Sequence, residues 1–320
     1  MNEVLKQIGD LGIVPVVKID NAKNAVPLGK ALINGGLPVV EITFRTNAAR
    51  EAIQNISAEL PEMLVGAGTV LNVDQVKSAV EAGAKFIVSP GFNSTVVEYC
   101  VNNGIAVTPG CCNPTDIEMA LSFGLDVVKF FPAEAFGGLS TIKAISAPYG
   151  ILKFIPTGGI NEKNIREYLS FNKILACGGS WMVKDELIKA ENFDEVARLT
   201  KEAVNLMLGF DLAHIGINAE NAESSMEIAK KFYRIFDMPL KEGNSSNFAG
   251  SGLEINKSKG LGTHGHIAIK TNNIKRAIAY MERNRIEVDM STAKGPEEAM
   301  VAVYLKEEIG GFAVHLLQNK

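Results

Sequence analysis

The sequence lacks the features that define several classes of protein. Its 320 residues include only four cysteines, and no two of these stand in a C-x-x-C pair. That spacing speaks against a disulfide framework and against a zinc ribbon. No run approaches the roughly 20 apolar residues that span a bilayer, and the N-terminus lacks the apolar core of a secretory signal. We therefore expect a cytoplasmic protein with reduced thiols and no membrane partner.

A basic stripe with interleaved aromatic residues, the usual mark of a nucleic-acid partner, is also missing. The chain carries 32 Lys and Arg against 36 Asp and Glu, so its formal net charge is -4. With 47% hydrophobic and 21% charged residues, the composition is that of an ordinary soluble protein. These numbers exclude nucleic acid as the expected partner and leave room for one large core or two domains.

Up to about residue 207, short runs rich in Val and Ile alternate with amphipathic stretches of helical period. The candidate strands are GIVPVVKI, PVVEITF, MLVGAGTV, KFIVSPG, IAVTPG, DVVKFFPA, KFIPTGG and KILACGGS. Strands that alternate with helices favour a parallel α/β sheet, and eight of them are the number that closes a TIM barrel. An open, doubly wound sheet is the alternative, but it would need a glycine-rich turn after the first strand, which is missing.

The character of the sequence changes after residue 207. The remainder holds all four histidines and no cysteine. It also holds an internal repeat, because HIGIN followed by AESSMEIAKKFYRIF is echoed by HIAIK followed by NIKRAIAYMERN. Each unit then runs into short strand-like pieces. We therefore predict two domains, residues 1–207 and 208–320.

Several polar side chains are predicted to point into the barrel. In VVEITFR, Glu41 and Arg45 share the face opposite the apolar residues, and the outer face of a barrel strand meets helices. The same parity turns Lys129 of DVVKFFPA and Thr69 of VGAGTV inward, and it extends to Lys18 on the first strand. An unpaired charge in an apolar interior is costly, so this group of residues needs an explanation.

The convergence of an amine, a carboxylate and a guanidinium suits one kind of chemistry. Apolar neighbours and a nearby Arg45 disfavour the charged form of Lys129, and a neutral lysine can attack a ketone and form a Schiff base. Glu41 can move the proton that this reaction requires, and Arg45 can clamp a substrate carboxylate. A buried ion-pair network that only fixes the order of the strands is the alternative, although such networks stabilise weakly.

Two Gly-Gly pairs close the last two predicted strands of the barrel. They lie in PTGGI (156–160) and CGGS (177–180). In barrels, the loops after the seventh and eighth strands often bind a phosphate through backbone N–H groups. We expect a phosphate site here, with a phosphorylated small molecule as the partner.

Six motifs in order, VVEITFRT, VGAGTVL, VSPG, KFFPAE, PTGGI and GGSW, closely resemble the 2-keto-3-deoxy-6-phosphogluconate (KDPG) and 4-hydroxy-2-oxoglutarate (KHG) aldolase family over about residues 5–207. The resemblance implies a (β/α)8 barrel, commonly a homotrimer, that acts as a class I aldolase without a cofactor. Its keto-acid substrates would be KDPG, cleaved to pyruvate and glyceraldehyde 3-phosphate, or KHG, cleaved to pyruvate and glyoxylate.

The resemblance also implies roles for particular residues. Lys129 would form the Schiff base, and Glu41 would act as the general acid and base. The implied substrate-binding residues are Arg45, Thr69, Pro90, Phe131, Lys18, Thr157, Gly158, Gly159, Gly179 and Ser180. The segment PGCCNPTDIE departs from the small-residue version usual in the family, which bears on the range of substrates. A phosphate-binding isomerase or epimerase, in which Lys129 and Glu41 transfer protons only, is the rival reading.

The second domain has its own candidate site. His214 and His266 open equivalent strands of the repeat, and Glu254 and His315 fall on the closing strands. These residue types suit a divalent metal, with Zn, Ni, Mn and Fe all open; a metal-free polar pocket is the alternative.

The layout resembles the vicinal-oxygen-chelate (glyoxalase-like) superfamily, which implies an α+β domain of paired βαβββ modules. A glutamate is usual there at the position of His315. A metal-dependent isomerase activity, further processing of a keto acid and regulatory binding all remain open for this domain.

Overall fold

The computed structural model describes residues 1–296 and 299–319. The chain forms two compact units, one from Met1 to Met207 and one from Leu208 onward. This division falls at the point where the sequence changes character. None of the helices in the described ranges is long and apolar enough to cross a membrane.

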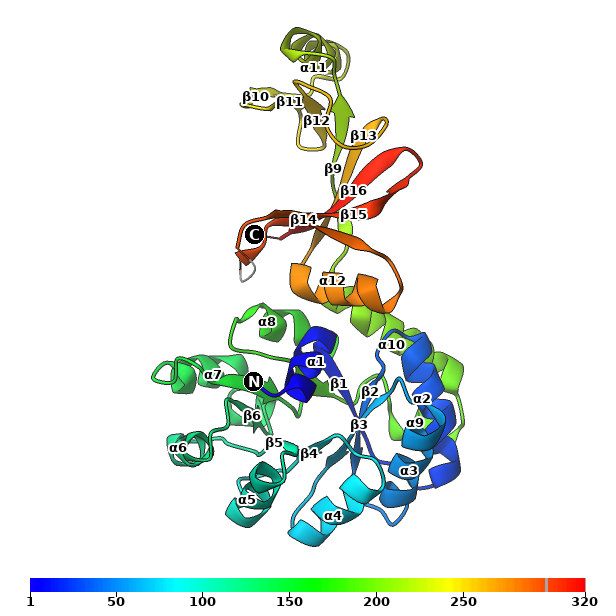
Figure 1. The fold of residues 1–320 in the computed structure, drawn as a ribbon, viewed down its shortest axis with the longest axis vertical. Coiled ribbons are helices and arrows are strands. Elements are labelled where there is room, and N and C mark those ends of the chain that lie inside the picture. The colour runs from blue at the N-terminus through cyan, green and yellow to red at the C-terminus, as the bar shows by residue number, and fades with distance from the viewer. Residues whose placement is uncertain (297–298, 320) are drawn as a thin grey trace. The chain divides into compact units, whose positions relative to one another are not determined.

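The first unit is a ring of eight parallel strands surrounded by helices (Figure 1). The strands are β1 (Ile13–Val17), β2 (Val39–Thr43), β3 (Leu64–Gly68), β4 (Phe86–Val88), β5 (Ala106–Thr108), β6 (Val127–Phe130), β7 (Lys153–Pro156) and β8 (Cys177–Gly179). They pair in the order β5-β4-β3-β2-β1-β8, and β6 pairs with β7. Single bridges close the ring, Gly110 with Lys129 between β5 and β6, and Thr157 with Gly178 between β7 and β8. The (β/α)8 barrel predicted from the sequence is therefore confirmed.

Helices follow the strands and cover the outside of the barrel. They are α2 (Ala25–Asn34), α3 (Ala49–Glu59), α4 (Val73–Glu81), α5 (Ser94–Asn102), α6 (Pro114–Ser122), α7 (Gly138–Ser146), α8 (Ile165–Ser170), α9 (Asp185–Lys189) and α10 (Phe193–Leu208), with the short turns η1 (Ala22–Asn24) and η2 (Glu134–Phe136). Asparagine side chains begin three of them, because Asn72, Asn93 and Asn113 each accept a hydrogen bond from a first-turn N–H group.

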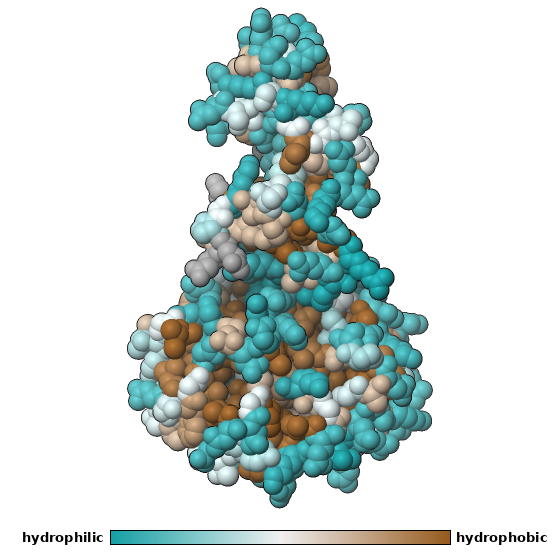
Figure 2. All heavy atoms as spheres, viewed as in Figure 1, coloured by the Kyte–Doolittle hydropathy of each residue, from teal (hydrophilic) through white to brown (hydrophobic). Residues whose placement is uncertain are grey.

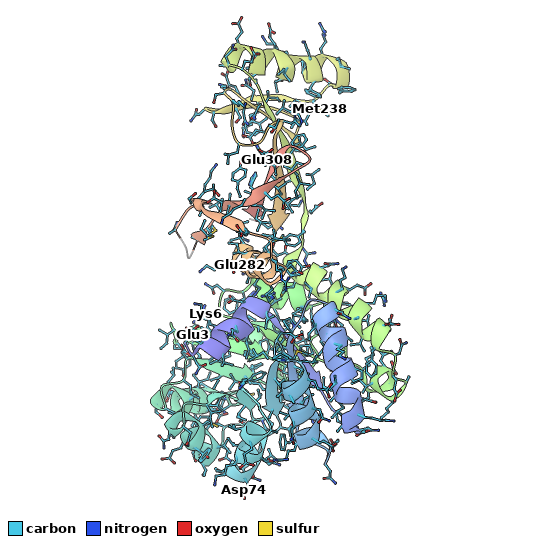
Figure 3. The ribbon with its side chains drawn as sticks, turned by 45° about the vertical axis from the view of Figure 1, so that its right-hand side comes forward. Glu3, Lys6, Asp74, Met238, Glu282 and Glu308 are labelled. Carbon is cyan, nitrogen blue, oxygen red and sulfur yellow. The ribbon has the colours of Figure 1, made fainter. Side chains whose placement is uncertain are left out.

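Helix α1 (Glu3–Leu11) plugs the amino-terminal end of the barrel. Its residues Leu5, Ile8 and Leu11 pack in one buried cluster with the inward side chains at the starts of the strands, Val14, Val39, Phe86, Ala106, Val127, Ile155 and Ala176. Glu3 and Lys6 lie on its outer side (Figure 3). Because apolar residues seal this end, the polar inward residues are confined to the carboxyl ends of the strands.

The second unit repeats one βαβββ module. The first module contains β9 (Asp211–Asn218), α11 (Ala222–Phe236), β10 (Leu240–Glu242), β11 (Ser246–Ala249) and β12 (Leu253–Asn256). The second contains β13 (Gly265–Thr271), α12 (Ile274–Arg283), β14 (Val288–Lys294), β15 (Ala302–Ile309) and β16 (Phe312–Gln318). Together these strands form one mixed sheet in the order β10-β11-β12-β9-β13-β16-β15-β14. This is the α+β fold of paired modules that the sequence predicted.

The two modules meet through their first strands, which pair antiparallel. His214 of β9 is opposite Ala268, and His266 of β13 is opposite Gly216. The closing strands lie parallel to the first ones, with Glu254 beside Gly216 and His315 beside Ala268. The register is therefore symmetric, and Glu254 and His315 occupy equivalent positions. Antiparallel and parallel neighbours that share a register share a face of the sheet, so the three histidines and Glu254 gather on one face.

Candidate functional site

Lys129 and Glu41 face each other inside the barrel. The amine Nζ of Lys129 on β6 lies 3.6 Å from Oε1 of Glu41 on β2, and the two residues are only 6% and 4% exposed. The ring of Phe131 lies beneath the amine, with its centroid 5.0 Å from Nζ. In the described part of the chain, Glu41 Oε1 has no hydrogen-bond partner. A carboxylate oxygen with spare acceptor capacity beside an amine can exchange a proton with a bound molecule.

The backbone fixes the direction of the amine. Lys129 N donates to Pro109 O at 2.9 Å, and its carbonyl accepts from Cys111 N at 2.8 Å. On the other side, Lys129 pairs with Ile155 of β7. Since β6 is held on both edges, its alternation decides which side chains point inward. Lys129 therefore cannot turn toward solvent without breaking the barrel.

Gly68 of β3 makes room for the carboxylate of Glu41. A Cβ atom on Gly68 would lie 2.0 Å from Glu41 Oε1 and 2.7 Å from its carboxyl carbon. The next residue, Thr69, has a positive φ of 57°, which is unusual for a β-branched residue. Its hydroxyl accepts from Arg45 Nε at 3.3 Å. Strained backbone of this kind is typical of functional sites. Here it places the Thr69 hydroxyl beside Arg45, the residue that is predicted to bind a substrate carboxylate.

A cavity of about 700 Å³ opens at this end of the barrel. Eight of the predicted substrate-binding residues line it: Lys18, Arg45, Phe131, Thr157, Gly158, Gly159, Gly179 and Ser180. Thr69 is connected to the cavity by its hydrogen bond with Arg45, which lines the cavity. Pro90 is outside this lining among the described residues, and its carbonyl instead packs against Gly110. The sequence did not single out Trp181, Asp185 and Glu186, which also line the cavity.

The loop after β7 brings two glycines into the wall of the cavity. Gly158 and Gly159 have φ angles of 97° and 83°, which favour glycine. Asn161 and Asn164 each donate a side-chain hydrogen bond of 3.0 Å to Gly159 O and so hold the turn. Thr157 Oγ1 is buried, and the described residues offer it no hydrogen-bond partner. An oxyanion of a bound substrate would find N–H and O–H donors here.

The segment that departs from the family pattern contacts the reactive strand. Cys112 Sγ donates to Phe131 O at 2.9 Å, and Cys111 Sγ donates to Asp116 O at 3.5 Å. Burial raises the pKa of both thiols. Because the thiolate is the nucleophilic form of cysteine, these two residues are poor nucleophiles, and their contacts with Lys129 O and Phe131 O support the backbone there.

Lys18 is held by two carboxylates that the sequence analysis missed. Its Nζ lies 3.2 Å from Asp20 Oδ1 and 3.3 Å from Asp185 Oδ2. Hydrogen bonds with Asp20 and then Asp185 raise the pKa of Lys18. Asp185 stands in the first turn of α9, where an acidic residue is expected for its effect on the helix dipole alone. Because a helix start alone can explain an acidic residue there, the sequence did not indicate that Asp185 lies in the cavity wall.

The four predicted metal ligands of the second unit converge on one face of the sheet. Nitrogen atoms of His214, His266 and His315 all lie within 4.8 Å of one another. Glu254 Oε2 lies 3.1 Å from His214 Nε2 and 3.5 Å from His266 Nε2. Its other oxygen accepts from Ser246 Oγ at 2.6 Å, which orients the carboxylate.

The electrostatics of this cluster suit a cation. Hydrogen bonds from His214 and His266 hold the pKa of Glu254 well below its usual range, so the carboxylate is charged. Burial, followed by the neighbouring His266 and His214, lowers the pKa of His315 to about 4. Its imidazole is therefore neutral near pH 7 and offers the lone pair of one ring nitrogen. His315 Nδ1 is buried without a hydrogen-bond partner among the described residues. Three imidazoles and one carboxylate form a donor set that fits a divalent transition metal.

A barrel with a buried lysine–carboxylate pair close to a cavity lined by glycine-rich loops has the architecture of a Schiff-base lyase. The family model of KDPG and KHG aldolase matches residues 3–199. A 2-dehydro-3-deoxy-phosphogluconate aldolase of Haemophilus influenzae is 46% identical over 205 residues, which cover 64% of this chain and 97% of that protein. A KHG/KDPG aldolase of Escherichia coli is 41% identical over 192 residues, covering 60% and 90%.

A solved structure has the same fold as the first unit. It is the KDPG aldolase of Legionella pneumophila with pyruvate captured as a covalent carbinolamine intermediate, and it shares 37% identity and a TM-score of 0.60 while covering 62% of this chain and 96% of its own. The chain therefore belongs to the KDPG and KHG aldolase family, and it is a carbon–carbon lyase.

Replacing Gly68 with Ala tests the contact between β3 and Glu41. The added Cβ would collide with the Glu41 carboxylate and displace it from Lys129, so we expect kcat for aldol cleavage to fall by about 100-fold, the lower end of a general acid–base contribution. Gly150→Ala is the matched control, because its Cβ would meet nothing within 4 Å. Wild-type kcat in a folded Gly68→Ala variant would contradict this account of the site.

Proposed function

We propose that the barrel cleaves KDPG to pyruvate and glyceraldehyde 3-phosphate, and KHG to pyruvate and glyoxylate, through a Schiff base on Lys129. The observation that carries the proposal is the buried Lys129–Glu41 pair, 3.6 Å apart, next to Phe131, which lines the substrate cavity together with Arg45. The names of the Haemophilus influenzae and Escherichia coli relatives support this substrate class.

The geometry supports a complete sequence of steps. The Lys129 amine adds to the C2 ketone, and loss of water gives an iminium ion. Glu41 removes the proton of the C4 hydroxyl, the C3–C4 bond breaks, and its electron pair passes into the iminium to form the enamine of pyruvate while the aldehyde leaves. Glu41 then returns the proton to C3, and water hydrolyses the imine. The Glu41 carboxylate carries out both of these proton transfers.

The remaining polar groups divide between the two ends of the substrate. Arg45, held by Thr69, suits the C1 carboxylate, since a guanidinium binds a carboxylate through paired hydrogen bonds. The Gly158–Gly159 loop and Ser180 suit the phosphate, because uncovered amides bind anions. Phe131 packs under the amine and keeps water away from the imine.

Borohydride trapping tests the covalent step. We expect wild-type protein incubated with pyruvate and borohydride to gain the mass of one reduced pyruvyl group per chain, and Lys129→Ala to gain none. Lys153→Ala, which removes a lysine from the neighbouring strand β7, should label like the wild type. An unlabelled wild type would instead favour an isomerase or epimerase that only transfers protons.

We also propose that the barrel self-associates. Apolar side chains are visible on the face shown in Figure 2, and the exposed ones of this unit include Leu71, Met119, Phe136 and Ile151. Such side chains are available to an interface between copies of the chain, and a homotrimer is the assembly that the family resemblance implies. We expect sedimentation equilibrium to give three times the 34.4 kDa mass of one chain; a monomer would contradict this.

We further propose that the second unit is a vicinal-oxygen-chelate domain that binds a divalent metal. His214, Glu254, His266 and His315 would hold the ion, and its chemistry would be that of a Lewis acid toward an oxygen ligand. The favouring observation is the convergence of four donors drawn from two symmetric modules. Ser246 would keep Glu254 in position, and Tyr304, whose ring lies 4.7 Å from that of His315, would limit access of water.

Calorimetric titration of the EDTA-treated full chain with Zn²⁺ or Ni²⁺ tests the metal site. We expect one ion per chain, and at least about 100-fold weaker binding after His266→Ala, a larger loss than that from an outer-shell change. His264→Ala is the matched control, because His264 is exposed and stands outside the cluster. Equal binding by both variants would mean that the cluster is a metal-free polar pocket.

A further inference from the structure

Lys18 stands between two cavities of the barrel. It lines the substrate cavity together with Gly158 and Gly159, and it also lines a smaller neighbouring cavity of about 280 Å³. Asp185 lines both cavities as well. The ion pair between Lys18 and Asp185, at 3.3 Å, is therefore part of the wall that separates them.

The charge of Lys18 is compensated before any substrate arrives. Its ammonium contacts Asp20 and Asp185 at similar distances, and Asp20 also contacts Lys189 at 3.4 Å. The group of one ammonium and its two carboxylates carries a net charge of -1. A phosphate that enters the cavity thus meets a cation that is already paired with two carboxylates.

The pair with Asp185 is the one that a substrate can open. The side chains of Lys18 and Asp185 are 33% and 49% exposed, and ion pairs with that much contact with water contribute little to stability. Asp20 keeps a second cation, Lys189, when Lys18 moves. A substrate phosphate and the Asp185 carboxylate therefore compete for the same ammonium at a low cost in stability.

We propose that Asp185 is a specificity-determining residue that weakens the barrel's preference for phosphorylated keto acids by competing with the phosphate for Lys18. The proposal rests on the aldol cleavage proposed above. A doubly charged phosphate gains more from a released ammonium than the singly charged carboxylate of a shorter keto acid does. Asp185 touches none of the reacting groups, so its influence falls on KM and leaves kcat unchanged.

The test compares Asp185→Asn with Glu186→Gln in the full-length chain. Glu186 lines the same cavity next to Asp185, and the described ion pairs of Lys18 involve Asp20 and Asp185 instead. Both variants remove one negative charge from the wall, but only Asp185→Asn removes one of the two carboxylates that hold Lys18. We expect Asp185→Asn to lower KM for KDPG by about threefold, as for a partly exposed ion pair, with a smaller change for KHG and for Glu186→Gln.

A double-mutant cycle with Lys18→Met isolates the interaction. In that background Asp185→Asn should no longer lower KM for KDPG. Equal effects of Asp185→Asn and Glu186→Gln would overturn the proposal, since they would reflect the general field of the cavity. A higher KM in Asp185→Asn would overturn it too, because Asp185 would then be needed to position Lys18.

The calorimetric affinity for inorganic phosphate gives the same comparison without turnover. We expect the tightest binding in Asp185→Asn and no gain from this substitution in the Lys18→Met background. If the wild type fails to cleave either keto acid, the proposed function fails, and phosphate binding still decides the role of Asp185. Indistinguishable phosphate affinities of the wild type and Asp185→Asn would overturn the inference even in an active aldolase.

Discussion

The structure of the barrel depends on the burial of the Lys129–Glu41 pair. Two charges removed from water lose hydration, and their mutual attraction at 3.6 Å offsets that loss only in part. Three features around the pair limit this desolvation cost. Helix α1 seals the opposite end with apolar side chains, so the polar residues meet at one end only. Gly68 lets the carboxylate approach, and the paired strands on both sides of β6 hold the lysine in place.

The second unit concentrates polar groups by a different route. In the barrel, neighbours around a closed ring bring the groups together. In the paired modules, a symmetric register does so, because His214 and His266 lie on antiparallel first strands and Glu254 and His315 lie on the closing strands beside them. Both units bury ionisable side chains that contribute little to stability by themselves. Their arrangement is explained by chemistry with a bound ion or substrate, as the proposed functions state.

Much of this architecture could be read from the sequence, because it follows from periodic patterns. Strand parity is a local property, so the inward direction of Glu41 and Lys129 was predictable from their immediate neighbours. The repeat in the second unit likewise revealed equivalent positions before any pairing was known. The left-handed φ of Thr69 was not predictable, since its sequence favours an extended strand. The closure of the barrel at β5–β6 and β7–β8 through single bridges also left no trace in local sequence.

Lys18 and Lys129 show that residue type and strand parity do not by themselves predict the properties of a side chain. Both were predicted to face the same interior, and both have a carboxylate neighbour, but their surroundings give them different properties. Lys129 is enclosed, with Phe131 beneath it and one carboxylate, that of Glu41, beside it. Lys18 lies partly in water between two carboxylates that stabilise its charge, so it cannot act as a nucleophile near neutral pH. The partners responsible, Asp20 and Asp185, come from segments 165 residues apart in sequence, and only the closing of β8 against β1 brings these segments together. The surroundings of Lys129 are thus determined largely by local pattern, whereas those of Lys18 are determined by tertiary contacts.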